Sequence, residues 1–150
     1  MSRLPARTPK RPAASPTLEG MLPLPEALVR REMIGMHLML AALRKQAAAP
    51  EYLVAIARVI VCASHLLDAG FGEARLEGLA AAHDALERNW RTAITSGVWG
   101  IDEATFTLFA DLLCLYEAQL RDAPARAVAL AMETRAPSRA DNTRTLSRAA

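Results

Sequence analysis

The feature of this sequence that most constrains its fold is a run of large apolar residues spaced as on one face of a helix. These residues recur at intervals of three and four: Phe106, Phe109, Leu113, Tyr116 and Leu120. Such spacing forms a seam over about two heptads, whereas a strand would alternate every second residue. Asp102, a short acceptor just before the run, is a favourable N-cap. The pattern predicts a helix with one strongly buried face.

A helix is also predicted between about residues 25 and 45. Pro25 suits the first helical position, where its missing N–H would have no partner anyway. The apolar stripe of this helix consists of Leu28, Met33, Met36, Leu40 and Leu43. Ile34, Leu38 and Ala41 widen the stripe, so we expect the helix to be contacted on two sides.

Two more helices are predicted between these segments. Pro50 can open one that is apolar nearly all round, which is typical of a core helix. The Gly-Phe-Gly of residues 70–72 ends it, because glycine supplies the left-handed geometry of a C-cap. The next helix covers residues 73–96. Its predicted stripe consists of Leu76, Leu79, His83, Leu86, Trp90 and Ile94.

The connections between these helices are short, which favours antiparallel neighbours. Strand-type alternation is absent over any useful length, and 150 residues suit one domain. The sequence therefore predicts an all-α single domain, a four-helix bundle-like array over residues 21–134. A short Ala-rich fifth helix can follow Pro124.

The two ends differ from the middle in composition and charge. Residues 1–20 contain four prolines, and their side chains sum to +3, as do those of residues 135–150. Residues 21–134 sum to −4. Repeated proline and few apolar residues predict disordered basic arms. Because arginine-rich arms can contact phosphates, nucleic acid is a candidate partner for them.

The sequence gives no sign of a membrane span or of secretion. No segment holds the ~18–20 uninterrupted apolar residues of a span, and no apolar signal core follows the N-terminal arginines. We therefore expect a cytoplasmic protein without membrane contact.

Cys62 and Cys114 lie in apolar helical stretches and are expected to be buried free thiols.

Short motifs of the common enzyme classes are missing. The sequence contains no Gly-x-Ser-x-Gly, no P-loop and no Gly-x-Gly-x-x-Gly. His37, His65 and His83 lie on three predicted helices and could meet in a bundle core, but the Glu-x-x-His of di-iron bundles does not occur. We expect a protein that is not an enzyme and has no cofactor or metal site. His83 is expected to be buried or half-buried.

Trp99 is the residue that helical periodicity does not explain. It lies in a short turn between Gly97 and Gly100, outside any apolar stripe. It either closes the end of the bundle as a plug or forms an exposed apolar patch with Val98 and Ile101. Such a patch would anchor a partner, because tryptophan is favoured at binding hot spots. These three residues are the candidate partner-binding site.

Several stretches of the chain together match a known pattern. They are Met36-His37-Leu38, Ala41-Ala42-Leu43-Arg44 and the stretches at residues 65–72, 97–100 and 113–120. Over roughly residues 22–122 the chain thus resembles small proteobacterial helical proteins often labelled Fis-family transcriptional regulators. The resemblance implies a DNA-linked regulatory role. Fis proteins bind DNA through a basic helix-turn-helix. Residues 106–120 contain no Lys or Arg, so no binding residue is carried over.

The sequence thus predicts a non-enzymatic helical protein that acts by binding a protein partner or a second copy of itself. The alternative is a DNA-associated transcriptional regulator that uses its basic arms. Salt separates the two, because phosphate contacts weaken steeply as salt rises whereas apolar contacts do not.

Trimming of the ends should leave the fold intact. Limited proteolysis is expected to remove residues 1–20 and 135–150, which bury little, and to leave a core of residues 21–134. The helical circular dichroism of that core should match the full chain per helical residue. Loss of the helical signal on trimming would contradict these boundaries.

Overall fold

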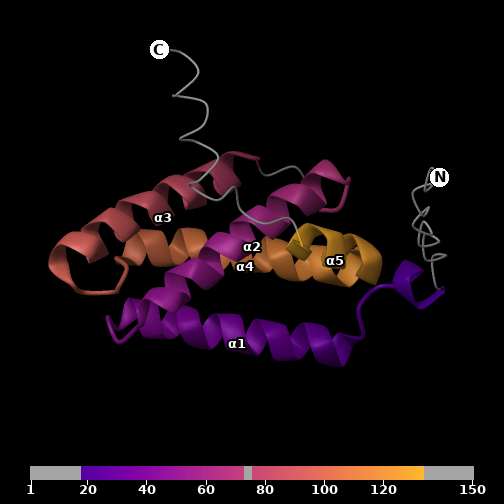
Figure 1. Ribbon diagram of the computed structural model, residues 1–150, viewed down its shortest axis with the longest axis horizontal. Coiled ribbons are helices and arrows are strands. Elements are labelled where there is room, and N and C mark those ends of the chain that lie inside the picture. Colours follow the sequence, from indigo (N-terminus) through magenta and orange to yellow (C-terminus); the bar gives the residue numbers. More distant parts are fainter. Residues whose placement is uncertain (1–17, 73–75, 134–150) are drawn as a thin grey trace, which may run out of the picture.

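The computed structural model describes residues 18–72 and 76–133, and in these ranges the chain forms helices and no strand (Figure 1). The elements are the 3-10 helix η1 (Leu18–Met21) and the α-helices α1 (Glu26–Arg44), α2 (Pro50–Asp68), α3 (Leu76–Ser96), α4 (Glu103–Asp122) and α5 (Ala125–Glu133). The predictions of an all-α fold and of a short fifth helix are confirmed. The expected arms lie outside the described residues, except for residues 18–20, which belong to η1.

Helix α4 lies in the middle of the array, and α1, α2 and α3 all contact it (Figure 1). Four residues of its predicted seam are at most 2% exposed: Phe109, Leu113, Tyr116 and Leu120. Phe106, the first of the seam, is half-buried, with the Arg44 guanidinium 4.5 Å from its ring centroid. The seam is therefore the surface on which the other helices pack.

The start of α4 has the predicted cap. The Asp102 carboxylate accepts a hydrogen bond from the Thr105 N–H at 2.7 Å, which satisfies one of the free donors of the first turn. Hydrogen bonds from the side chain and the N–H of Thr105 hold the pKa of Asp102 below its usual range. The carboxylate is thus ionised at neutral pH and complements the positive end of the helix.

Helix α2 lies inside the array, in contact with α1, α3, α4 and α5. Its buried residues cover about half of the helix surface: Leu53, Ile56, Val59, Ile60, Cys62, Ala63 and Leu66. In the described part of the chain it is the one helix long and apolar enough to span a membrane, a property that core helices of soluble proteins share.

Helix α3 corrects part of the sequence interpretation. The predicted stripe placed His83 and Ile94 towards the core, but both are exposed, Ile94 by 65%. The helix instead buries the small side chains Ala82, Ala85 and Ala93, together with Leu79. Methyl side chains allow the backbone of α3 to approach α4 closely. Leu86 and Trp90 of the stripe are half-buried at the flank, while His83 and Ile94 lie outside.

Asn89 lies on the same side of α3 as the alanines and ties the helix to α4. Its Nδ2 donates to Thr105 Oγ1 at 3.1 Å and to the Ala85 carbonyl at 2.8 Å. The spacing of apolar residues does not reveal this contact, because asparagine is a polar residue that is expected to face solvent. The hydrogen bonds help to fix which face of α3 points inwards.

Helix α1 lies at the edge of the array and is buried on one side only (Figure 1). The expectation of contacts on two sides is wrong, because Ile34 and Leu38 are 55% and 67% exposed and Ala41 is exposed as well.

Cys114 on α4 is likewise exposed, contrary to the prediction, because it lies on the side of α4 opposite the seam. Cys62 is buried as predicted.

Two loops meet at one end of the array. The Ile101 N–H donates to the Leu43 carbonyl at 3.1 Å, which links the turn before α4 to the end of α1. A Cβ at Gly100 would lie 2.6 Å from Gln46 Cγ, so only glycine fits there without a shift. Gln46 itself has a φ of +54°. The end of α1 and the turn before α4 therefore pack as one unit.

At the other end, the segment before α1 is joined to the start of α5. The Ala125 N–H donates to the Leu22 carbonyl at 2.8 Å, and Pro23 and Pro124 form an isolated antiparallel bridge. This clasp, formed by residues 22–23 and 124–125, connects parts of the chain about a hundred residues apart and positions α5 beside η1 and α2.

The seam and the cap should differ clearly in their contributions to stability. Phe109→Ala is expected to lower the free energy of unfolding by about 3–5 kcal/mol, because it leaves a cavity among fully buried neighbours. Asp102→Ala removes a cap and should cost only about 1 kcal/mol. Urea denaturation of both variants measures the difference, and equally small losses would contradict the central role of α4.

Candidate functional site

The structure does not assemble the predicted patch around Trp99. The Trp99 ring is half-buried and meets Trp90 of α3 edge to face, with ring centroids 5.2 Å apart and an interplanar angle of 71°. Ile101 is 5% exposed, so its expected place on a surface patch is corrected: its backbone bond to the end of α1 draws it into the core. Val98 is 49% exposed. Trp99 therefore fits the plug interpretation better than the anchor.

A polar cleft lies beside this turn, between the end of α3 and the start of α4. Its volume is about 600 Å³, and its lining includes Arg88, Asn89, Thr92 and Asp102. The start of a helix attracts anions, but here the Asp102 carboxylate already accepts from the first turn. The Asp102 carboxylate thus already occupies the position at the helix start that an external anion would take.

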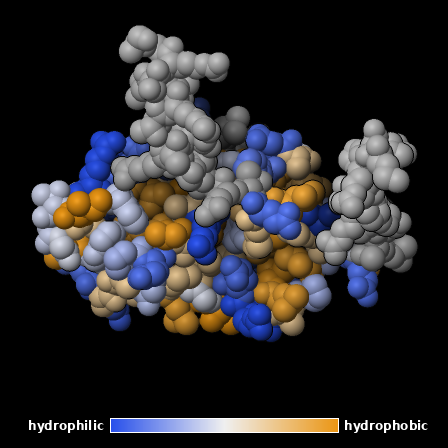
Figure 2. All heavy atoms as spheres, viewed as in Figure 1, coloured by the Kyte–Doolittle hydropathy of each residue, from blue (hydrophilic) through white to orange (hydrophobic). Residues whose placement is uncertain are grey.

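A second hollow, a groove of about 640 Å³, lies between α1, α2 and α5. Figure 2 shows apolar side chains gathered where these helices meet. Its lining is mostly apolar: Met36, Val54, Ala55, Ala57, Val59, Val61, Ala131 and Met132, with Glu32, Arg58 and Glu133 as the charged members. The groove also reaches Cys62 and Tyr116.

Cys62 and Tyr116 lie at the buried side of the groove. The Tyr116 hydroxyl and the Cys62 thiol are neighbours, and burial raises the pKa of both groups. A thiol with a raised pKa is protonated at neutral pH and is a poor nucleophile. Cys62 and Tyr116 therefore act here as packing residues.

The histidines lie apart on α1, α2 and α3. His83, expected to be buried, is exposed, with its Nδ1 3.8 Å from Asp84 Oδ1, because α3 turns its alanine side inwards. Among residues 18–72 and 76–133, no group of three or more His, Cys, Asp or Glu side chains could hold a metal ion.

The clearest unassigned surface is on α1, on the side opposite its buried residues. We call it the α1 outward face. It comprises Ala27, Arg30, Arg31, Ile34, Leu38, Ala41 and Lys45, all of them exposed. Ile34, Leu38 and Ala41 follow the spacing of one helical stripe. Figure 2 shows apolar side chains along the lower edge of the molecule, where α1 lies.

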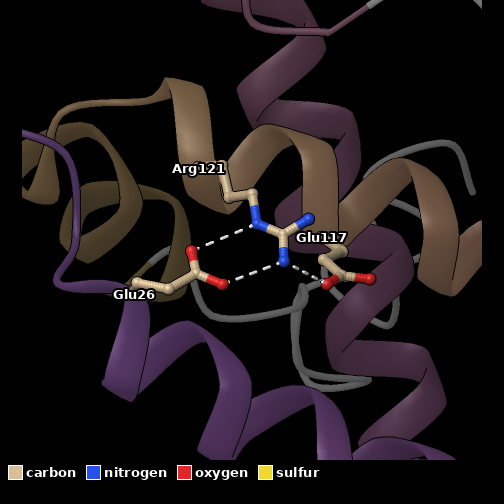
Figure 3. A network of polar contacts seen from close by, with 3 residues as sticks. All are labelled: Glu26, Glu117 and Arg121. Atoms are coloured by element: carbon tan, nitrogen blue, oxygen red, sulfur yellow. Dashed lines mark hydrogen bonds and ion pairs between the residues drawn. The ribbon is translucent and has the colours of Figure 1, made fainter.

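The acidic residues of α1 point away from this face. Arg121 of α4 donates to both oxygens of Glu26, at 3.3 Å from Nε and 3.0 Å from a terminal nitrogen, and also contacts Glu117 at 2.8 Å (Figure 3). The Arg121 side chain holds the pKa of Glu26 below its usual range. Glu32 lines the groove. The α1 outward face is therefore apolar along its centre and purely basic at its edges.

Sequence reasoning found the apolar members of this face but assigned them to the core. The signal that separates the two interpretations is charge, because Arg30, Arg31 and Lys45 flank the stripe on the same side of the helix. Charged side chains are almost never fully buried unless they are paired, so three cations along the stripe favour an exposed face.

The environment of Trp99 leads to a stability prediction. Trp99→Ala should lower the free energy of unfolding by about 2–4 kcal/mol, because it removes the contact with Trp90 and leaves a partial cavity. The neighbouring Val98→Ala is the matched control and should change stability by less than about 0.5 kcal/mol. Chemical denaturation measures both. An unchanged midpoint for Trp99→Ala would return this residue to the list of partner contacts.

The structure therefore narrows the candidate site to a helical face that combines exposed apolar and basic side chains. Comparison of the chain with protein-family models, with curated proteins and with solved structures found no match.

Proposed function

We propose that this protein is a non-enzymatic helical module that acts by binding a protein chain through its α1 outward face. The observation that carries the proposal is the exposure of Ile34 and Leu38 on the side of α1 opposite the core. Burial of a large aliphatic side chain is favourable by about 1.5–3 kcal/mol, so a partner that covers both residues gains substantially.

The geometry of this face suits a helical partner. Its apolar residues follow the spacing by which one helix packs against another, and its cations lie at the edges, where the rim of an interface is polar. A protein that contacts this face would bury the stripe while the long Arg and Lys side chains remain partly solvated.

DNA-associated regulation is the alternative proposal. It would use the basic arms, residues 1–20 and 135–150, and it draws on the resemblance to proteins labelled as Fis-family regulators. Its signature is a steep loss of binding as salt rises, with a slope that reports the number of phosphate contacts. Contact through the apolar stripe of α1 would respond much less.

Site-specific photo-crosslinking in cells tests the leading proposal. A photoreactive amino acid at position 38 of the full chain should give a discrete adduct with a protein. The same group at position 94 is the matched control, because Ile94 on α3 is equally exposed and apolar. We expect an adduct at position 38 that exceeds the control by about tenfold, as an energetic centre of an interface would. No adduct at position 38, or equal adducts at both positions, would overturn the proposal.

A further inference from the structure

Helix α4 carries a second exposed stripe, opposite its seam, which we call the α4 outward face. It comprises Glu103, Thr107, Asp111, Cys114, Ala118 and Asp122, all exposed and spaced by three or four residues. Residues 103–120 contain no Lys or Arg. Arg121, near its end, is occupied by Glu26 and Glu117. Glu103 is itself paired with Arg44 of α1 at 2.8 Å. The other two carboxylates, Asp111 and Asp122, make this face acidic, with the small side chains of Cys114 and Ala118 between them.

We propose, building on the function proposed above, that the partner of the α1 outward face is the α4 outward face of a second copy of this chain. The first face is basic with a raised apolar centre, and the second is acidic with a low centre of Cys114 and Ala118. Ile34 and Leu38 can pack over these small side chains, and complementary charge at the edges sets the register.

The dimensions of the two faces agree. Arg31 and Lys45 are 14 residues apart, which is about 21 Å along a helix at a rise of 1.5 Å per residue. Asp111 and Asp122 are 11 residues apart, or about 17 Å. The difference is shorter than the reach of the two long basic side chains, so both cations can meet a carboxylate at once.

Charge disfavours the other occupants that this chain offers. Contact between two α1 outward faces would place Arg31 and Lys45 against the same cations of the other copy, and like charges repel at an interface. The terminal segments 1–20 and 135–150 each sum to +3 and would be repelled in the same way. Within one chain the pairing cannot form, because α1 and α4 contact each other through their opposite, buried sides.

A pair of charge reversals tests the proposal on the full-length protein. Variant one carries Arg31→Glu and Lys45→Glu, so that both of its outward faces are acidic. Variant two carries Asp111→Lys and Asp122→Lys, so that both of its faces are basic. Sedimentation velocity should show association of the native chain, and the Kd of each variant alone should rise by at least about tenfold. An equimolar mixture of the two variants should associate again, because each then meets the opposite charge.

The matched control is Arg88→Glu with Arg126→Glu, which changes the net charge as variant one does but leaves both outward faces intact; it should associate like the native chain. Circular dichroism confirms that each variant is folded. A native chain that stays monomeric up to about 100 μM, or a mixture that does not associate while both variants are folded, would overturn the inference.

The photo-crosslink at position 38 gives a second measurement. The inference requires an adduct of twice 16.2 kDa, with the crosslinked peptide from residues 103–122. An adduct that contains a different protein would overturn self-association while leaving the proposed binding function intact. No adduct at all would overturn both.

Discussion

Burial of the apolar seam of α4 is the interaction on which the rest of this molecule depends. Most of the stability of a helix in a protein comes from packing its apolar face rather than from intrinsic propensity, so α1, α2 and α3 gain their stability on a common surface. That surface is the row of Phe109, Leu113, Tyr116 and Leu120. Since three helices are arranged around one side of α4, its opposite side is left to solvent and is free to take acidic residues.

A buried glutamine interrupts the apolar interior around α4. The Gln119 side chain is fully buried, and its Nε2 donates to the Ala63 carbonyl at 3.0 Å and to the Phe71 carbonyl at 3.1 Å. A Cβ at Gly72 would lie 3.0 Å from Gln119 Cγ, at a φ of +93° that favours glycine. These two directional hydrogen bonds fix the axial position of α4 relative to α2. Apolar packing alone would allow several such positions.

The parts of the fold that could be predicted are those where large apolar residues recur with a helical period. The helix number, the α4 seam and the Asp102 cap follow from such signals. The inward face of α3 could not be predicted in this way. It is formed by alanines and Asn89, whose contacts depend on how closely the backbones of α3 and α4 approach. Ile34 and Leu38 were assigned to the core because hydrophobic spacing is the same for a core and for an interface. Trp99 was recognised as unusual, but its packing against Trp90 depends on where α3 ends.

The clasp at residues 22–23 and 124–125 has a mechanical consequence. It joins the segment before α1 to the segment that begins α5. A force that pulls these two segments apart therefore acts directly on this contact. The clasp rests on the hydrogen bond from the Ala125 N–H to the Leu22 carbonyl, and a contact with so few bonds opens at a lower free energy than the core helices do. Once the clasp opens, η1 is free of α5, and the nine residues of α5 are held only by their packing on α2 and their link to α4.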